Sequence, residues 1–363
     1  MRIKCDICDS VFSYPYNISQ HKHPEYELGG VPANVWTLIC EGEINETKKG
    51  SNLFRYFNCD FISSQISLGE GNTSLIEVEQ NLYIKDESTN PTGSFKDRGM
   101  PFLMNEALYS GKKKIAICST GNAAISLIQY AKAYGVKPIV FVPKDLPKKK
   151  REMLDADEIH YSENIITCFE DFFAFCEENE DVFNGFLSTD PAYIMGLASL
   201  SYEIYDQLNE TVPDYIFLPC ASGGNIVAQF SGWKRMLDKG EIKRMPRFVF
   251  VQIEGGNPVQ QGFEHKQRDK LYVIEEPADS KTILSSDTCF NYFKIYEMLE
   301  DKHAIACSIQ DSDIDKLDME LKMKYDYTSL SVIAAFEKMK NELKENEKAV
   351  LIMTAKNRGE ENE

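Results

Sequence analysis

The sequence predicts an α/β protein of two domains, with parallel sheets covered by helices. Two observations support this prediction. From about residue 71 onward, short β-rich runs alternate with helical patterns, which is typical of parallel strands joined by crossover helices. The chain of 363 residues is also longer than one hydrophobic core usually supports.

The alternation can be followed in order along the chain. We expect strands at residues 82–85, 114–118, 138–142, 215–218, 248–253 and 349–353. Helical patterns lie between them, at residues 97–110, 123–134, 169–179, 194–208 and 226–237. Each helix is long enough to cross back over a sheet and return the chain to a parallel strand.

The composition excludes several classes of partner. A net charge of −17 opposes binding to a phosphate backbone, so no nucleic acid is expected. No apolar run is long enough to span a bilayer, and no apolar core follows the first basic residues as in a secretory signal. Ten scattered cysteines are few for a disulfide scaffold. We therefore expect reduced thiols and a cytoplasmic protein.

The most informative segment runs from Lys85 to Arg98 and reads KDESTNPTGSFKDR. An apolar strand leads into a polar, Pro- and Gly-containing turn, and Lys96 then stands at the start of a helical pattern. A lysine amine that is partly desolvated forms a Schiff base with an aldehyde cofactor. Lys96 is therefore the candidate catalytic residue, although a lone lysine would be interpreted as an ordinary loop cation.

This segment resembles the pyridoxal phosphate (PLP) lysine segment of threonine synthases, within fold type II, the tryptophan synthase β-like superfamily. Three further segments match that family in order: its opening motif, its substrate-carboxylate loop and its cofactor-phosphate loop, at residues 68–75, 119–126 and 219–225. The resemblance spans about residues 67–354. It implies a PLP-dependent lyase with two α/β domains, PLP in the interdomain cleft, and Lys96 bonded to the cofactor.

The resemblance also implies a domain organisation. A leader at 1–49 precedes a large PLP-binding domain made of 50–95 and 197–357. A small substrate domain covers 96–196, and a charged, frayed tail covers 358–363. We further expect a homodimer that acts on a small amino-acid substrate.

Two loops are candidate anion sites, because each follows an expected strand and opens a helix. In the first loop, the resemblance assigns the substrate carboxylate to Ser119, Thr120, Gly121, Asn122 and Ser126, and the phenolic oxygen of the cofactor to Asn122. In the second, it assigns the cofactor phosphate to Ala221, Ser222, Gly223, Gly224 and Asn225. The alternatives remain a helix cap for the first loop and a plain turn for the second.

Thr354 follows the last expected strand. The resemblance implies that its hydroxyl bonds to the pyridine nitrogen of PLP, where a neutral group leaves that nitrogen largely unprotonated. A threonine at a strand end can also be structural. Asp326 to Ser329 stands where the family commonly has Glu-Pro-x-Ser, and the match is weak because the proline is missing.

The segment from Asp190 to Gly196 departs from the family. Many threonine synthases have Asn-Pro-x-Arg-x-x-Gly here, and the arginine holds the phosphate of O-phosphohomoserine. In this chain Tyr193 occupies the place of the arginine and Asp190 that of the asparagine. A carboxylate next to a phosphate is unfavourable, and a bidentate donor is lost. The sequence therefore supports PLP chemistry more strongly than it supports this substrate.

Three hypotheses remain open at the level of sequence. The first is a threonine synthase, which converts O-phosphohomoserine to threonine and phosphate. The second is a β-elimination or β-replacement enzyme that acts on serine, threonine, O-phosphoserine or O-acetylserine. The third is a non-catalytic PLP-binding relative, which the presence of Lys96 and both loops disfavours.

The leader contains Cys5 and Cys8 at the spacing of a zinc ribbon, followed by His21, His23 and Cys40. Two cysteines at this spacing with a later ligand bind zinc tetrahedrally in many proteins. Threonine synthases with such a ribbon usually carry a second pair, of which only Cys40 is present here. We expect a degenerate, metal-free ribbon, with zinc on Cys5, Cys8 and Cys40 as the alternative.

Overall fold

The computed structural model describes residues 2–5, 8–13, 27–28, 31–32, 36–39, 52–57, 59–317 and 319–358. The chain forms two compact units. The first consists of Met1–Glu70, Lys96–Leu197 and Arg358–Glu363, and the second consists of Gly71–Phe95 and Ala198–Asn357. None of the helices in these residues is both long and apolar enough to cross a bilayer.

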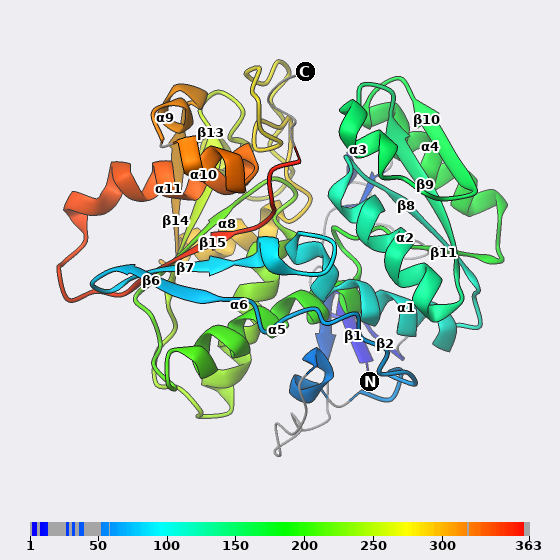
Figure 1. Ribbon diagram of the computed structural model, residues 1–363, viewed down its shortest axis with the longest axis horizontal. Coiled ribbons are helices and arrows are strands. Elements are labelled where there is room, and N and C mark those ends of the chain that lie inside the picture. Colours follow the sequence, from blue (N-terminus) through cyan, green and yellow to red (C-terminus); the bar gives the residue numbers. More distant parts are fainter. Residues whose placement is uncertain are drawn as a thin grey trace. The chain divides into compact units, whose positions relative to one another are not determined.

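A parallel sheet forms the centre of the first unit (Figure 1). Its strands, in the described residues, are arranged in the order β10-β9-β8-β11. They are β8 (Lys114–Cys118), β9 (Lys137–Pro143), β10 (Glu158–Ser162) and β11 (Val182–Asn184). Helices α2 (Asn122–Tyr134) and α4 (Ile165–Glu178) pack against the sheet, and α1 (Met100–Tyr109) packs on α2. The short α3 (Lys148–Glu152) follows β9. The boundary between the two units falls within α5 (Pro191–Gln207), after Leu197.

The leader adds small antiparallel elements to the first unit. β1 (Arg2–Cys5) pairs with β2 (Val11–Ser13) and β5 (Trp36–Ile39), and β3 (Glu27–Leu28) pairs with β4 (Val31–Pro32). Residues 50–70, which the sequence assigned to the large domain, group with the first unit instead. Phe54 explains part of this grouping, because its ring centroid lies 5.0 Å from that of Phe102 in α1.

The second unit is built on a larger sheet (Figure 1). Among the described residues its strand order is β14-β13-β12-β15-β7-β6, parallel except for the edge strand β6. The strands are β6 (Leu75–Glu79), β7 (Leu82–Asp86), β12 (Tyr215–Pro219), β13 (Arg247–Ile253), β14 (Ala304–Ile309) and β15 (Ala349–Met353). The helices are α6 (Gly224–Asp238), α7 (Pro258–Glu264), α8 (Tyr292–Glu300), α9 (Asp311–Asp315), α10 (Met319–Lys324) and α11 (Tyr327–Met339).

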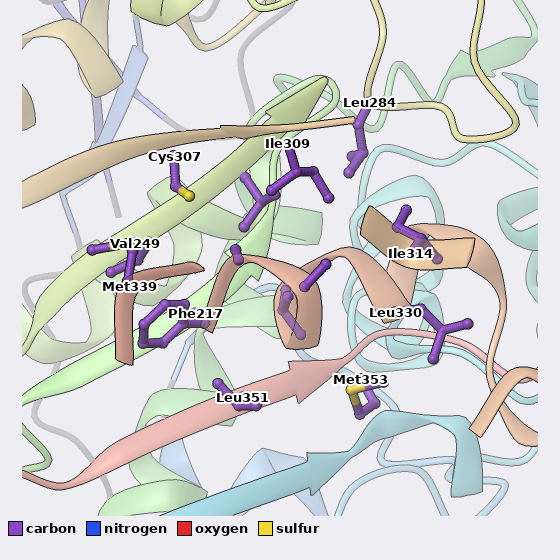
Figure 2. Close-up of a cluster of buried hydrophobic side chains, with 14 of the residues drawn as sticks. Phe217, Val249, Leu284, Cys307, Ile309, Ile314, Leu330, Met339, Leu351 and Met353 are labelled. Atoms are coloured by element: carbon purple, nitrogen blue, oxygen red, sulfur yellow. The ribbon is translucent and has the colours of Figure 1, made fainter. Parts of the chain in front are cut away.

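A continuous apolar core holds α11 against this sheet. Phe217, Val249 and Leu351 point from successive strands toward α11, which contributes Leu330 and Met339 (Figure 2). All five side chains are at least nine-tenths buried. Burying a large aliphatic or aromatic side chain stabilises a fold by about 1.5–3 kcal/mol. This core therefore fixes the ends of β12 and β15, where the functional loops begin.

The predicted α/β class with parallel sheets is confirmed. All six predicted strands are present as β7, β8, β9, β12, β13 and β15, within one residue at each end. The helix expected at 97–110 is instead a 3-10 turn, Phe95–Arg98, followed by α1. The tail prediction is wrong at Arg358, which is buried with 8% of its surface exposed.

Candidate functional site

Lys96 lies in the 3-10 turn that precedes α1, where the chain re-enters the first unit. Burial lowers the pKa of its amine to about 8, because low-dielectric surroundings disfavour the ammonium form. The residue as a whole keeps partial solvent exposure. A lysine of this kind exists partly as the free amine near neutral pH, which is the form that attacks an aldehyde.

Lys85, the other lysine of the informative segment, has a structural role. Its Nζ donates to Glu203 Oε1 at 2.5 Å, to Thr73 O at 2.7 Å and to Gln207 Oε1 at 2.7 Å. An ammonium group has three donor hydrogens, and these three acceptors use them all. Lys85 and Glu203 are both fully buried, so this pair fixes the start of the second unit rather than carrying out chemistry.

Buried polar groups surround Lys96 in the first unit. Asp97 is fully buried and accepts a 2.5 Å hydrogen bond from Ser126 Oγ. Ser126, which we predicted to contact substrate, is therefore engaged with Asp97 in this structure. Tyr193 is also buried, and its hydroxyl donates to Lys96 O at 3.4 Å. Burial, with the charges of Asp97 and Asp190, raises the pKa of Tyr193 well above its usual range.

The ring of Tyr193 packs against the backbone at Gly99. A β-carbon at Gly99 would lie 2.4 Å from the Tyr193 ring, so the ring packs directly on the backbone next to the 3-10 turn. Asp190 accepts from Tyr193 N at 2.7 Å in the first turn of α5. Burial raises the pKa of Asp190 to about 6. The pair thus forms a compact, buried support for Lys96.

The loop from Ser119 to Asn122 joins β8 to α2. Ser119 Oγ accepts from Gly121 N at 3.0 Å and from Ala124 N at 3.2 Å, so the hydroxyl satisfies donors at the start of the helix. Gly121 has φ +128°, a conformation that favours glycine. Gly121 is the N-cap residue of α2, and Ser119 satisfies a helix donor from two positions before it. The loop lies at a helix N-terminus, where anions are favoured.

Two cations that sequence reasoning did not assign lie against this loop. A β-carbon at Gly121 would be 2.6 Å from Lys150 Cδ, so the methylenes of Lys150 cover the glycine. Arg358 Nε donates to Asn122 Oδ1 at 2.9 Å. Both residues are more than nine-tenths buried. No local pattern marks them, because α3 is rich in surface lysines and Arg358 stands in a charged tail.

The second loop joins β12 to α6. Gly223 has φ +80°, and a β-carbon there would lie 2.6 Å from Ile295 Cδ1. Asn291, which sequence reasoning missed, supports the loop: its backbone N and its Nδ2 both donate to Ser222 O. Asn225 Nδ2 is buried and has no hydrogen-bond partner among the residues that the structure describes. A buried, unsatisfied donor costs about 1–3 kcal/mol, so an acceptor is expected beside Asn225.

Thr354 lies at the end of β15 and belongs to a chain of hydroxyl groups. Its Oγ1 is 3.0 Å from Ser329 Oγ, which donates to Asp326 Oδ1 at 2.5 Å. Asp326 also caps α11 by accepting from Ser329 N at 2.8 Å. The weak sequence match at Asp326 to Ser329 thus corresponds to a real neighbour of Thr354.

The structure groups the predicted residues within the two units. Lys96, the Ser119–Asn122 loop and Ser126 belong to the first unit, and residues 221–225 and Thr354 belong to the second. In the leader, Cys5 is buried and Cys8 Sγ donates to Ser10 Oγ. Within the described ranges no cluster of three or more His, Cys, Asp or Glu side chains could hold a metal, and His21, His23 and Cys40 lie outside those ranges.

The chain is similar in sequence to known enzymes. Residues 66–355 match the sequence profile of the family described as "Pyridoxal-phosphate dependent enzyme". A threonine synthase of Methanocaldococcus jannaschii is 30% identical over 311 residues, covering 80% of this chain and 76% of that protein. A threonine synthase of Methanosarcina acetivorans is 26% identical, covering 85% and 75% respectively.

Solved structures share the fold. The processed form of threonine deaminase isoform 2 from Solanum lycopersicum matches with a TM-score of 0.62 at 18% identity, over 78% of this chain and 84% of that protein. An L-serine ammonia-lyase from Rhizomucor miehei matches with a TM-score of 0.65 at 19% identity, over 78% and 93%. The fold type II assignment is thereby confirmed.

The residues present fit pyridoxal phosphate. The unsatisfied Nδ2 of Asn225, beside a glycine that leaves no room for a side chain, suits a phosphate oxygen. Lys96 supplies an amine with a pKa of about 8 for the aldehyde. The hydroxyl of Thr354 suits a ring nitrogen, since it can either donate or accept.

Proposed function

We propose that this chain, a lyase of the pyridoxal-phosphate dependent enzyme family, converts O-phosphohomoserine and water to threonine and phosphate. The observation that carries the proposal is the gathering of Lys96, the Ser119–Asn122 loop and the buried cation Lys150 in one folded unit. The threonine synthases that it resembles over four-fifths of its length support the same reaction.

Bound PLP supplies an electron sink for charge that develops at the α-carbon of an amino acid. The proposed roles of the protein are to hold that group and to move protons around it. Asn225 and the backbone at Gly223 bind the phosphate, Thr354 contacts the ring nitrogen and Asn122 contacts the phenolic oxygen.

Lys96 Nζ is the proton carrier in this proposal. A group with a pKa of about 8 accepts and returns a proton readily near neutral pH, because neither form is strongly favoured. Tyr193 and Asp97 keep the surroundings of the lysine buried, and the hydroxyl of Tyr193 holds the Lys96 carbonyl. The backbone that carries Nζ is thereby held in place.

Lys150 is the proposed contact for an anionic group of the substrate. Its methylenes lie on Gly121, so its ammonium belongs to the neighbourhood of the loop that would receive a carboxylate. A charged hydrogen bond of this kind contributes about 1.5–3 kcal/mol. Lys144, Lys148 and Lys234 are exposed at the surface, whereas Lys150 is buried.

A second candidate is elimination or replacement at the β-carbon of serine, threonine, O-phosphoserine or O-acetylserine. Tyr193 and Asp190 favour it, because they occupy the places where many threonine synthases have an arginine and an asparagine for the phosphate. Both are buried against the backbone near Lys96, and neither is a cation. A non-catalytic role is disfavoured by the lowered pKa of Lys96.

The two candidates release different products. The PLP-loaded protein is incubated with O-phosphohomoserine, and free phosphate and threonine are measured. Parallel reactions with serine, threonine, O-phosphoserine and O-acetylserine are assayed for 2-oxo acid, ammonia and the released leaving group. Phosphate and threonine in equal amounts support the first proposal. Turnover of the β-substituted substrates alone rejects it in favour of the second, and Lys96→Ala controls for background hydrolysis.

A further inference from the structure

Arg358 makes a long-range contact that neither the fold nor the reaction class explains. It lies at the end of the described chain, yet it belongs to the first unit and has only 8% of its surface exposed. Its Nε donates to Asn122 Oδ1 at 2.9 Å, across 236 positions of sequence. Its Nη1 lies 3.4 Å from Met153 Sδ, just after α3, which holds the guanidinium from a second direction.

The chemistry of this contact determines the orientation of the Asn122 amide. A guanidinium group carries donors only, so the atom facing Nε must be the amide oxygen. The two ends of an asparagine side chain have nearly the same shape, and the hydrogen-bond partners decide which end points where. With Oδ1 engaged by Arg358, Nδ2 is turned to another neighbour as a donor.

We propose that Arg358 is a positioning residue that presents Asn122 Nδ2 to the phenolic oxygen of PLP. This inference rests on the proposed role of Asn122. The opposite orientation would direct the lone pairs of Oδ1 at an oxygen that is also an acceptor, which is repulsive. A cation bonded to Oδ1 also polarises the amide and strengthens Nδ2 as a donor. Arg358 acts through Asn122 and does not need to touch the cofactor.

The test compares five full-length proteins that differ from the natural one by point changes. Arg358→Met keeps an unbranched side chain of similar length but removes every donor. Asn122→Ala removes the amide, and the double variant removes both. Arg358→Lys restores a charged donor, and Met153→Leu is the matched control, since it removes the sulfur contact and leaves the Arg358–Asn122 bond. Each protein is stripped of cofactor and titrated with PLP.

Two readouts separate positioning from simple structural support. The first is the dissociation constant for PLP, and the second is the visible absorption band of the bound cofactor, which responds to hydrogen bonding at its phenolic oxygen. We expect Arg358→Met to weaken PLP binding about tenfold, the size expected for one charged hydrogen bond, and to shift the band. Asn122→Ala should do the same, the double variant should add nothing further, and Arg358→Lys should recover part of both effects.

Each contrary result has one meaning. An unchanged band and dissociation constant in Arg358→Met, with both altered in Asn122→Ala, overturns the positioning role. Additive effects in the double variant also overturn it, because Arg358 then acts independently of Asn122. If Asn122→Ala changes neither readout, the proposed role of Asn122 fails together with this inference, whereas attachment of PLP to Lys96 stands. If Arg358→Met does not fold, Arg358→Lys is compared with Met153→Leu on the same readouts, and equality of the two rejects the proposal.

Discussion

Replacing Lys96 by methionine should stabilise the cofactor-free protein, although it removes the catalytic amine. In the folded protein the pKa of Lys96 is lowered from 10.5 to about 8 by burial. The pKa difference of about 2.5, at about 1.4 kcal/mol for each unit, corresponds to about 3.5 kcal/mol of stability that the folded protein loses when the amine is protonated. Because Lys96 is partly exposed, solvent screening reduces this value, and we expect a gain of about 2 kcal/mol.

The sign and pH range of this effect follow from the lowered pKa. Between pH 8 and 10.5 the unfolded chain binds more protons than the folded protein, so the free energy of unfolding rises with pH in this range. Below pH 8 the full penalty is present, and above 10.5 it has disappeared. The advantage of Lys96→Met over the natural protein should therefore be complete at pH 7 and absent near pH 10.5.

Urea unfolding of the cofactor-free proteins at several pH values measures this advantage. Lys85→Met is the control of opposite sign, because it removes the cation that pairs with the buried carboxylate of Glu203 and should cost about 3–5 kcal/mol. A destabilised Lys96→Met, or a gain that does not change with pH, would refute the argument that desolvation lowers the pKa of Lys96.

Three other predictions concern the cofactor, the substrate and the core. Asn225→Ala removes the unsatisfied donor and should weaken PLP binding about tenfold in an equilibrium titration; an unchanged PLP affinity would contradict the proposed contact of Asn225 with the phosphate. Lys150→Met should raise KM for O-phosphohomoserine about tenfold and leave PLP affinity within twofold; an unchanged KM would remove Lys150 from the substrate site. Leu330→Ala should lower the free energy of unfolding by about 2–5 kcal/mol, since the side chain is fully buried between α11 and the sheet, and a loss below 1 kcal/mol would contradict this packing.

In the four-stranded sheet and the six-stranded sheet, the sequence predicted the interior strands and missed the edge strands. β7, β8, β9, β12, β13 and β15 are interior strands, and each is an apolar run because neighbours and helices bury it. In these two sheets the strands that we did not predict, β6, β10, β11 and β14, all lie at the edges; the short strands of the leader, β1 to β5, were not predicted either. Edge strands tolerate more polar residues than interior strands, as in β10, which contains Glu158, His160 and Ser162. The pattern of β10 therefore resembles that of a loop.

The residues of the candidate site also fall into two groups, those that the sequence predicted and those that it did not. Lys96, Asn122 and the glycine loop could be predicted because each occurs in a short contiguous motif. Lys150 and Arg358 could not, since each reaches the Ser119–Asn122 loop from a segment whose local composition indicates only a charged surface. Contacts of this kind depend on the tertiary fold and leave no local pattern.

The pairing of β7 with β15 has a consequence for synthesis of the protein. Leu82 in β7 lies opposite Ala349 in β15, so these two neighbouring strands are separated by most of the chain. The four-stranded sheet of the first unit, in contrast, uses strands that lie between Lys114 and Asn184. On the ribosome, that sheet can assemble while the remainder is still being translated. The sheet of the second unit must wait until its last interior strand has emerged, and until then the edge of β7 that will face β15 is unpaired and requires protection from aggregation.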